Sequence, residues 1–183
     1  IIAMSIVLTL SCKEEPIIPN FEDQTRLSIY DYILLHKEDF SSFLSILEKA
    51  NIDKTLSAYN PNGTGYTLFL PDNDAIDRFI KESDEFSDLN DLLADTAYLN
   101  ILCRYHIVNM SISTDDFPLG ALPEFTLSGD QLTVSFIIEP DTSYHKINNQ
   151  APVVFQDIEL SNGYINLISE MLSPVIYKSE ERR

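Results

Sequence analysis

Basic residues are scarce in this chain of 183 residues. It has 12 Lys and Arg against 29 Asp and Glu, which gives a formal net charge of −17 at pH 7. Proteins that bind nucleic acid neutralise phosphates with clustered Lys and Arg, so this composition excludes that class of function. It also disfavours electrostatic attachment to an anionic membrane surface. If the chain is held at a membrane, another kind of attachment is needed.

Metal-binding and catalytic patterns are missing as well. The three histidines, His36, His106 and His145, lack metal-ligand spacing with another His or Cys. Residues 72–77 begin like a calcium-binding loop, but the sixth position is not Gly, and the twelfth is Ser83 rather than Glu. No Gly-x-Ser-x-Gly element and no phosphate-binding glycine loop occurs. We therefore expect no metal, no cofactor and no enzymatic activity.

Cysteine occurs only at Cys12 and Cys103. Cys103 lies in the apolar run 98–108, where we expect an inert, buried thiol. Cys12 follows Ser11 at the end of the apolar run 1–10, which is too short to span a bilayer but fits the apolar region of a secretory signal. This stretch resembles a truncated bacterial lipoprotein signal, in which Cys12 is acylated and becomes the mature N-terminus. The alternative is an ordinary buried Cys in a short apolar strand.

The chain divides into four expected segments. They are a lipoprotein signal peptide over 1–11, a lipidated Cys and tether over 12–25, one folded domain over 26–177 and a charged tail over 178–183. The sequence Lys-Glu-Glu at 13–15 resembles the acidic export tag of surface lipoproteins in Bacteroidetes, which implies an outer-membrane protein exposed at the cell surface. A hydrophobic content of 44% is enough for a sizeable core in a single domain.

The most informative stretch is 66–79, Y-T-L-F-L-P-D-N-D-A-I-D-R-F. Its first five residues, 66–70, are β-branched, aromatic or apolar throughout, which predicts a strand buried on both faces. Pro71 has no N–H to donate, so strand pairing is expected to end there. Asp72 and Asn73 are both N-cap residue types, and apolar residues then recur at helical spacing. The stretch therefore predicts a buried strand that leads directly into an amphipathic helix.

Hydrophobic periodicity outlines the other elements. Two short helices are expected within 29–47, with an interruption at 36–39. A longer helix is expected over 97–108, with Thr96 as its cap. Shorter helices are predicted at 52–56 and 89–93, and strands at 122–127, 131–138, 144–148 and 151–158.

The segment 157–172, D-I-E-L-S-N-G-Y-I-N-L-I-S-E-M-L, contains a predicted hairpin turn. The turn, Ser161-Asn162-Gly163, needs positive φ, which Asn and Gly tolerate. The segment resembles the second signature motif of the fasciclin (FAS1) domain, D-I-x-x-S-N-G-x-I-H-x-I-D-x-x-L. Two positions depart from that motif: Asn166 replaces the usual His, and Ser169 replaces the usual Asp.

Two further elements support the same resemblance. The stretch 66–79 resembles the first fasciclin signature, T-x-F-x-P-x-N-x-A-F, and Tyr105-His106 resembles the Tyr-His element between the two motifs. All three occur in the order that the family has, and the resemblance covers about residues 25–176. It implies an α+β fold in which a twisted wedge of β-sheet is covered by several short α-helices.

The resemblance also implies candidate interaction residues. Similar domains in animal extracellular matrix proteins bind integrins, with roles proposed for an Asp-Ile pair and the Tyr-His region. The matching positions here are Tyr105, His106, Asp157 and Ile158. Each also has a structural explanation, namely core packing for Tyr105 and Ile158 and hydrogen bonding for His106 and Asp157.

The expected function is therefore non-enzymatic. We expect adhesion, or an accessory role in an outer-membrane complex of the nutrient-importer type, with a transporter or another surface lipoprotein as the protein partner. The alternative is a glycan-binding module, for which Tyr59, Tyr66 and Tyr144 are candidate contacts. The sequence Asp95-Thr96-Ala97 resembles a short O-glycosylation motif of Bacteroidetes, but a helix cap at Thr96 is the favoured explanation.

Overall fold

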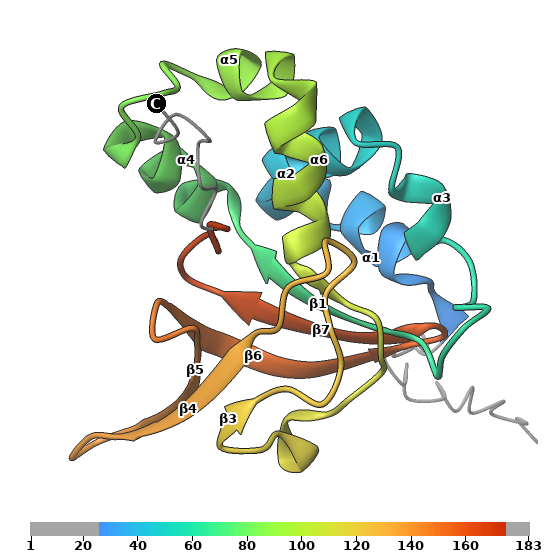
Figure 1. Ribbon diagram of the computed structural model, residues 1–183, viewed down its shortest axis with the longest axis vertical. Helices are drawn as coiled ribbons and strands as arrows, with labels where there is room; N and C mark the ends of the chain where they lie inside the picture. The colour runs from blue at the N-terminus through green and yellow to red at the C-terminus, as the bar shows by residue number, and fades with distance from the viewer. Residues whose placement is uncertain (1–25, 175–183) are drawn as a thin grey trace, which may run out of the picture.

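The computed structural model describes residues 26–174, which form one seven-stranded mixed sheet with helices beside it (Figure 1). The strands are β1 (Tyr66–Pro71), β2 (Ile107–Val108), β3 (Gly120–Ala121), β4 (Thr133–Ile138), β5 (Ser143–Ile147), β6 (Ala151–Leu160) and β7 (Gly163–Ile168). Their order in the sheet is β2-β1-β7-β6-β5-β4-β3, and only β1 and β7 pair in parallel. The predicted α+β class, with short helices on a twisted sheet, is confirmed.

The helices gather at one end of the molecule, and the β4–β5 hairpin extends from the other end (Figure 1). The predicted signal peptide, Cys12, the tether and the charged tail lie outside the described residues. The helices are α1 (Ile29–Leu35), α2 (Lys37–Lys49), α3 (Asp53–Leu56), α4 (Asn73–Glu82), α5 (Leu89–Ala94) and α6 (Thr96–Tyr105).

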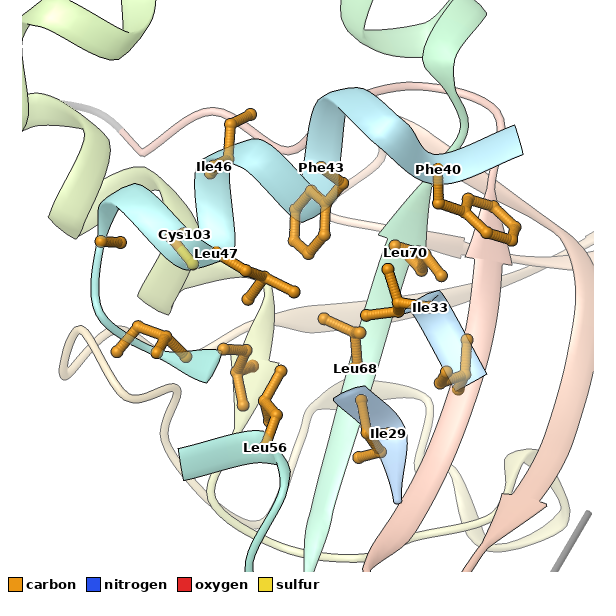
Figure 2. Packing of buried hydrophobic residues seen from close by; sticks show 14 of the residues in the cluster. Ile29, Ile33, Phe40, Phe43, Ile46, Leu47, Leu56, Leu68, Leu70 and Cys103 are labelled. Atoms are coloured by element: carbon orange, nitrogen blue, oxygen red, sulfur yellow. The ribbon is translucent and has the colours of Figure 1, made fainter. Parts of the chain in front are cut away.

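Strand β1 lies between two hydrophobic cores, and all six of its residues are buried, as predicted. Leu68 and Leu70 face the helices, whereas Phe69 faces a second core on the other side of the sheet. This alternation follows from the two-residue period of a strand. Figure 2 shows Phe43 and Leu47 of α2 packed over the helical side of β1.

The strand-to-helix transition is also confirmed, and it has an additional role. The carboxylate of Asp72 accepts a hydrogen bond from the N–H of Ala75 at 2.7 Å and caps α4. Asn73 instead accepts from the N–H of Ser42 at 2.9 Å, just after α2 kinks at the non-helical residue Phe40. The predicted interruption is found at His36, between α1 and α2, and Asn73 ties α2 to the start of α4.

The helix predicted at 97–108 is shorter than expected, and its predicted cap is wrong. Asp95 caps α6, since its carboxylate accepts from the N–H of Tyr98 at 3.0 Å, and Thr96 is the exposed first residue of the helix. The helix ends at Tyr105 because the next residues pair with β1 as strand β2, with Ile107 opposite Leu68.

The strand predicted at 122–127 does not form. Pro123 has no N–H for a ladder. Thr126 closes a tight turn, donating from its N–H to the carbonyl of Asp130 at 2.8 Å. A single bridge, Val108 to Thr126, is what remains of strand pairing there.

Candidate functional site

His106, in the predicted Tyr-His element, is fully buried at the end of α6. The N–H of Leu172 donates to its Nε2 at 3.1 Å, so Nε2 must be unprotonated and Nδ1 carries the proton. Nδ1 then donates to the carbonyl of Leu102 at 2.8 Å. Both ring nitrogens are therefore used within the fold. Burial disfavours the imidazolium and lowers the pKa of His106 to about 4.

This lowered pKa predicts a loss of stability in mild acid. Because the folded-state pKa of about 4 lies below the unfolded value of 6.5, stability is fully present above pH 6.5 and falls as pH drops toward 4. The expected contribution is a loss of about 2 kcal/mol in the free energy of unfolding between pH 7 and pH 5. Urea denaturation of wild type and His106→Gln at both pH values measures it. Carboxylates titrate in both proteins, so the variant should lose about 2 kcal/mol less than the wild type between pH 7 and pH 5. An equal loss in both proteins would contradict the assignment.

Asp157, in the second signature segment, lies in a bulge of β6 with φ 58°. Its carboxylate accepts from the N–H of Thr114 at 2.8 Å and also from the hydroxyl of Thr114. Its own N–H donates to Oδ1 of Asn166 at 3.0 Å. The carboxylate thus joins the 3-10 helix η2 (Thr114–Asp116) to the sheet. Asn166, where the resembling motif has His, holds the backbone of the bulge.

Tyr105 and Ile158 lie in the interior. Ile158 is part of the core under the helices, whereas Tyr105 belongs to the second core, so the two do not share a surface. The Tyr105 hydroxyl accepts from the amide of Asn148 at 2.9 Å, and burial raises the pKa of this phenol. With His106 and Asp157, all four candidate interaction residues are therefore engaged in packing or internal hydrogen bonds.

Asn162 and Gly163 hold the second signature segment against the rest of the fold, and the predicted reason for Asn162 is wrong. Gly163 has φ 149°, but Asn162 is not among the residues with positive φ. Its buried amide instead joins three segments. Oδ1 accepts from the N–H of Ile29 at 2.9 Å, and Nδ2 donates to the carbonyls of Leu56 and Ala58 at 2.7 and 2.9 Å.

Large apolar side chains are exposed on strands β4 and β6. Phe136, Ile138, Val154 and Phe155 have exposed fractions of 45, 79, 61 and 59%, and we call these four residues the hairpin surface. Beside them, β5 pairs with β6 at only two positions, so the strands diverge around a cleft of about 260 Å³. Within each strand the two exposed residues are close in sequence, and exposed apolar groups that lie together mark interaction sites more often than isolated ones do.

An aromatic cluster supports the hairpin from the side of the second core. The ring of His145 on β5 lies 5.1 Å from Phe136 and 5.5 Å from Phe117, centroid to centroid. Phe117 in turn contacts Phe69 of β1. Nδ1 of His145 is buried without a hydrogen-bond partner. This surface could not be predicted from the sequence, because β4 and β5 show the same alternation of apolar and polar residues as strands whose apolar face is covered.

The three tyrosines considered for glycan binding are placed differently. Tyr66 is only 4% exposed in β1, so its selection as a surface contact was wrong. Tyr59 is 76% exposed. Tyr144 lines the cleft between β5 and β6, and its hydroxyl donates to Glu139 at 3.1 Å.

The described part of the chain contains no cluster of three or more His, Cys, Asp or Glu able to hold a metal ion. The Cys103 thiol is buried, and burial raises its pKa to about 12, which keeps it protonated. Two larger clefts, of about 440 and 510 Å³, have no His or Cys in their linings. Within residues 26–174, no helix has both the length and the apolar character needed to cross a bilayer.

Comparisons with known proteins agree with this geometry. The family model of the fasciclin domain matches residues 38–174. Stabilin-2 of Rattus norvegicus is 25% identical over 135 residues, which are 73% of this chain but only 8% of stabilin-2. The solved FAS1 domain pair of the insect cell adhesion molecule fasciclin I is similar to this chain with a TM-score of 0.55 and 18% sequence identity. The match covers 75% of this chain and 46% of the fasciclin I chain. The chain belongs to the fasciclin domain family.

Proposed function

We propose that this protein is a non-enzymatic, adhesion-type domain that binds a protein partner through the hairpin surface. The observation that carries the proposal is the exposure of four large apolar side chains on β4 and β6. Both hydrophobic cores are formed by other residues, so these four are not needed for core packing. Fasciclin domains are in general non-catalytic adhesion modules, which supports a binding function.

We further propose that Cys12 is lipidated and anchors the domain at the outer membrane, on the cell surface. Cys12 lies outside the described residues. The 13 residues that follow Cys12, 13–25, span at most roughly 45 Å when extended. Such a tether restricts the domain to partners in or on the same membrane and raises their effective concentration. An outer-membrane importer, with this protein as its accessory subunit, or another surface lipoprotein fits these limits.

Affinity purification from mildly solubilised membranes tests the proposal. A tagged wild-type chain should recover a transporter or a second surface lipoprotein in fixed ratio. The double variant Val154→Lys and Phe155→Lys should lose that protein, because each substitution places a charge in the apolar contact. Leu34→Lys with Leu35→Lys is the matched control, since these α1 residues are 46 and 53% exposed and the charge change is the same.

Partner recovery that persists in the hairpin variant, or is lost equally in the α1 variant, would contradict the proposed surface. Cys12→Ala tests the anchor in the same preparation. It should release the protein from the membrane, and mass spectrometry of the wild type should find an acylated Cys12. An unmodified Cys12, or residues retained before it, would refute lipidation.

A glycan ligand is the second candidate, favoured by the exposed ring of Tyr59 and by Tyr144 in the β5–β6 cleft. Aromatic faces stack on sugar rings in many binding modules. Recovery of the protein alone, together with glycan binding that Tyr59→Ala or Tyr144→Ala abolishes, would favour this candidate.

A further inference from the structure

The outer edge of β4 is open over most of its length. Strand β3 covers β4 only where Gly120 and Ala121 pair with Val134 and Thr133. Pro118, two residues before β3, has no N–H and cannot continue the ladder. Residues 135–138 of β4 therefore have a strand on one side, β5, and none paired on the other.

The hydrogen bonds at both ends of β4 show which backbone groups point to this open edge. The carbonyl of Thr133 accepts from Asn148, at the end of β5, at 2.8 Å, and the N–H of Glu139 donates to Thr142 at 2.9 Å. The direction of the backbone N–H and C=O groups alternates along a strand. These groups therefore point toward β5 at residues 133, 135, 137 and 139. The N–H and C=O groups of Phe136 and Ile138 then point outward.

This edge lacks the usual protection against pairing. Natural edge strands carry Lys, Pro or an inward-pointing charge, or are covered by another element. Residues 135–138 are Ser-Phe-Ile-Ile, with no such residue among them, and Phe136 and Ile138 are 45 and 79% exposed. An extended strand added here would satisfy four backbone groups and cover apolar side chains.

We propose that the occupant is a second copy of this chain, paired antiparallel through the same edge. Phe136 then lies opposite Ile138 of the second copy and exchanges two hydrogen bonds with it, and the reciprocal pair adds two more. Ile137 lies opposite Ile137 of the second copy. Apolar and aromatic side chains thus meet as cross-strand neighbours.

Charge does little to oppose pairing at this edge. The chain has a net charge of −17, yet between residues 131 and 156 its only charged side chains are Glu139, Asp141 and Lys146. The proposed register places Glu139 opposite Ser135 of the second copy. The two Glu139 side chains are then four residues apart, roughly 13 Å along the strand, which is beyond the Debye length of about 8 Å at physiological salt. The β4–β5 hairpin extends away from the helices (Figure 1). In the proposed dimer, the helical parts of the two copies would therefore stay apart.

This inference rests on the proposed function only in taking the hairpin as a binding surface. Sedimentation equilibrium of the full chain carrying Cys12→Ala tests it. We expect a monomer–dimer equilibrium that strengthens as NaCl screens the repulsion between copies. Ile138→Pro removes one outward-pointing N–H from each copy, and it leaves every hydrogen bond between β4 and β5 in place. It should therefore weaken the dimer at least about tenfold. Leu35→Lys should leave it unchanged.

Disulfide trapping in the same background tests the register. Ile137→Cys should form a disulfide between copies, since facing residues of a non-hydrogen-bonded pair lie about 4.5 Å apart. Ser135→Cys should not, because those two positions are about four residues apart along the strands. A monomer at all concentrations, or a dimer that Ile138→Pro leaves intact, would overturn the inference. If a foreign partner were still lost with Val154→Lys and Phe155→Lys, the proposed function would stand without it.

Discussion

Replacement of Gly163 with alanine is expected to lower the free energy of unfolding by more than about 3 kcal/mol. Gly163 begins β7 and lies opposite Tyr66 in the parallel pairing with β1. A Cβ at this position would overlap the carbonyl oxygen of Tyr66 and lie 2.7 Å from its carbonyl carbon. The backbone also has φ 149°, which side chains rarely adopt. Since β1 carries residues of both cores, it cannot move away without disturbing them.

Gly129→Ala is the matched control for this substitution. Gly129 also has positive φ, 92°, but a Cβ there would meet nothing within 4 Å. It therefore reports the backbone strain alone, about 1–2 kcal/mol. Guanidinium denaturation of both variants should show a much larger loss for Gly163. Equal losses would show that the close contact with Tyr66 does not limit position 163.

Asn162→Ala is expected to cost about 3–5 kcal/mol. The substitution removes three hydrogen bonds at once and leaves the N–H of Ile29 and the carbonyl of Leu56 buried without partners. Each unsatisfied buried group costs about 1–3 kcal/mol. The effect reaches beyond the turn, because the lost bonds hold the start of α1 and the end of α3 against the sheet.

Asn100→Ala provides the comparison. The Asn100 amide donates to the carbonyl of Ala50 at 3.2 Å and accepts from Nε of Arg104 at 2.8 Å, but both contacts are only partly buried, so water can replace them. A loss of about 1 kcal/mol or less is expected there, by denaturation at pH 7. If Asn162→Ala lowers the free energy of unfolding no more than Asn100→Ala does, then the amide of Asn162 does not hold the segments together.

The sequence was sufficient where local chemistry and packing agree. The apolar residues of 66–70 and the cap at Asp72 predicted the buried strand and the helix after it, and both form. The sequence was insufficient where a residue far away in the chain determines the role of a side chain or the end of an element. The amide of Asn162 binds two distant segments, the start of α1 and the end of α3, and nothing near it in the sequence shows that. The helix predicted to reach residue 108 stops at Tyr105 because β1 takes Ile107 as a strand partner.

The candidate site illustrates the same limit for function. The signature motifs drew attention to Tyr105, His106, Asp157 and Ile158, and the structure uses all four internally. The exposed hairpin could not be found from periodicity, because an alternating strand looks alike whether its apolar face is covered or not. Tyr66 shows the converse, since an aromatic residue suitable for a surface contact is buried in the core that β1 forms with the helices.

Hydrogen exchange tests the central claim, that the hairpin surface is the binding site, most directly. Amide exchange is compared, by mass spectrometry of peptides, between the protein in native membranes and the dilute purified chain carrying Cys12→Ala. If the hairpin surface is the binding site, protection in the membrane should rise over residues 135–156 and stay unchanged over 105–106 and 157–158. Unchanged exchange over 135–156, with new protection at the signature motifs or on the helices, would contradict the account.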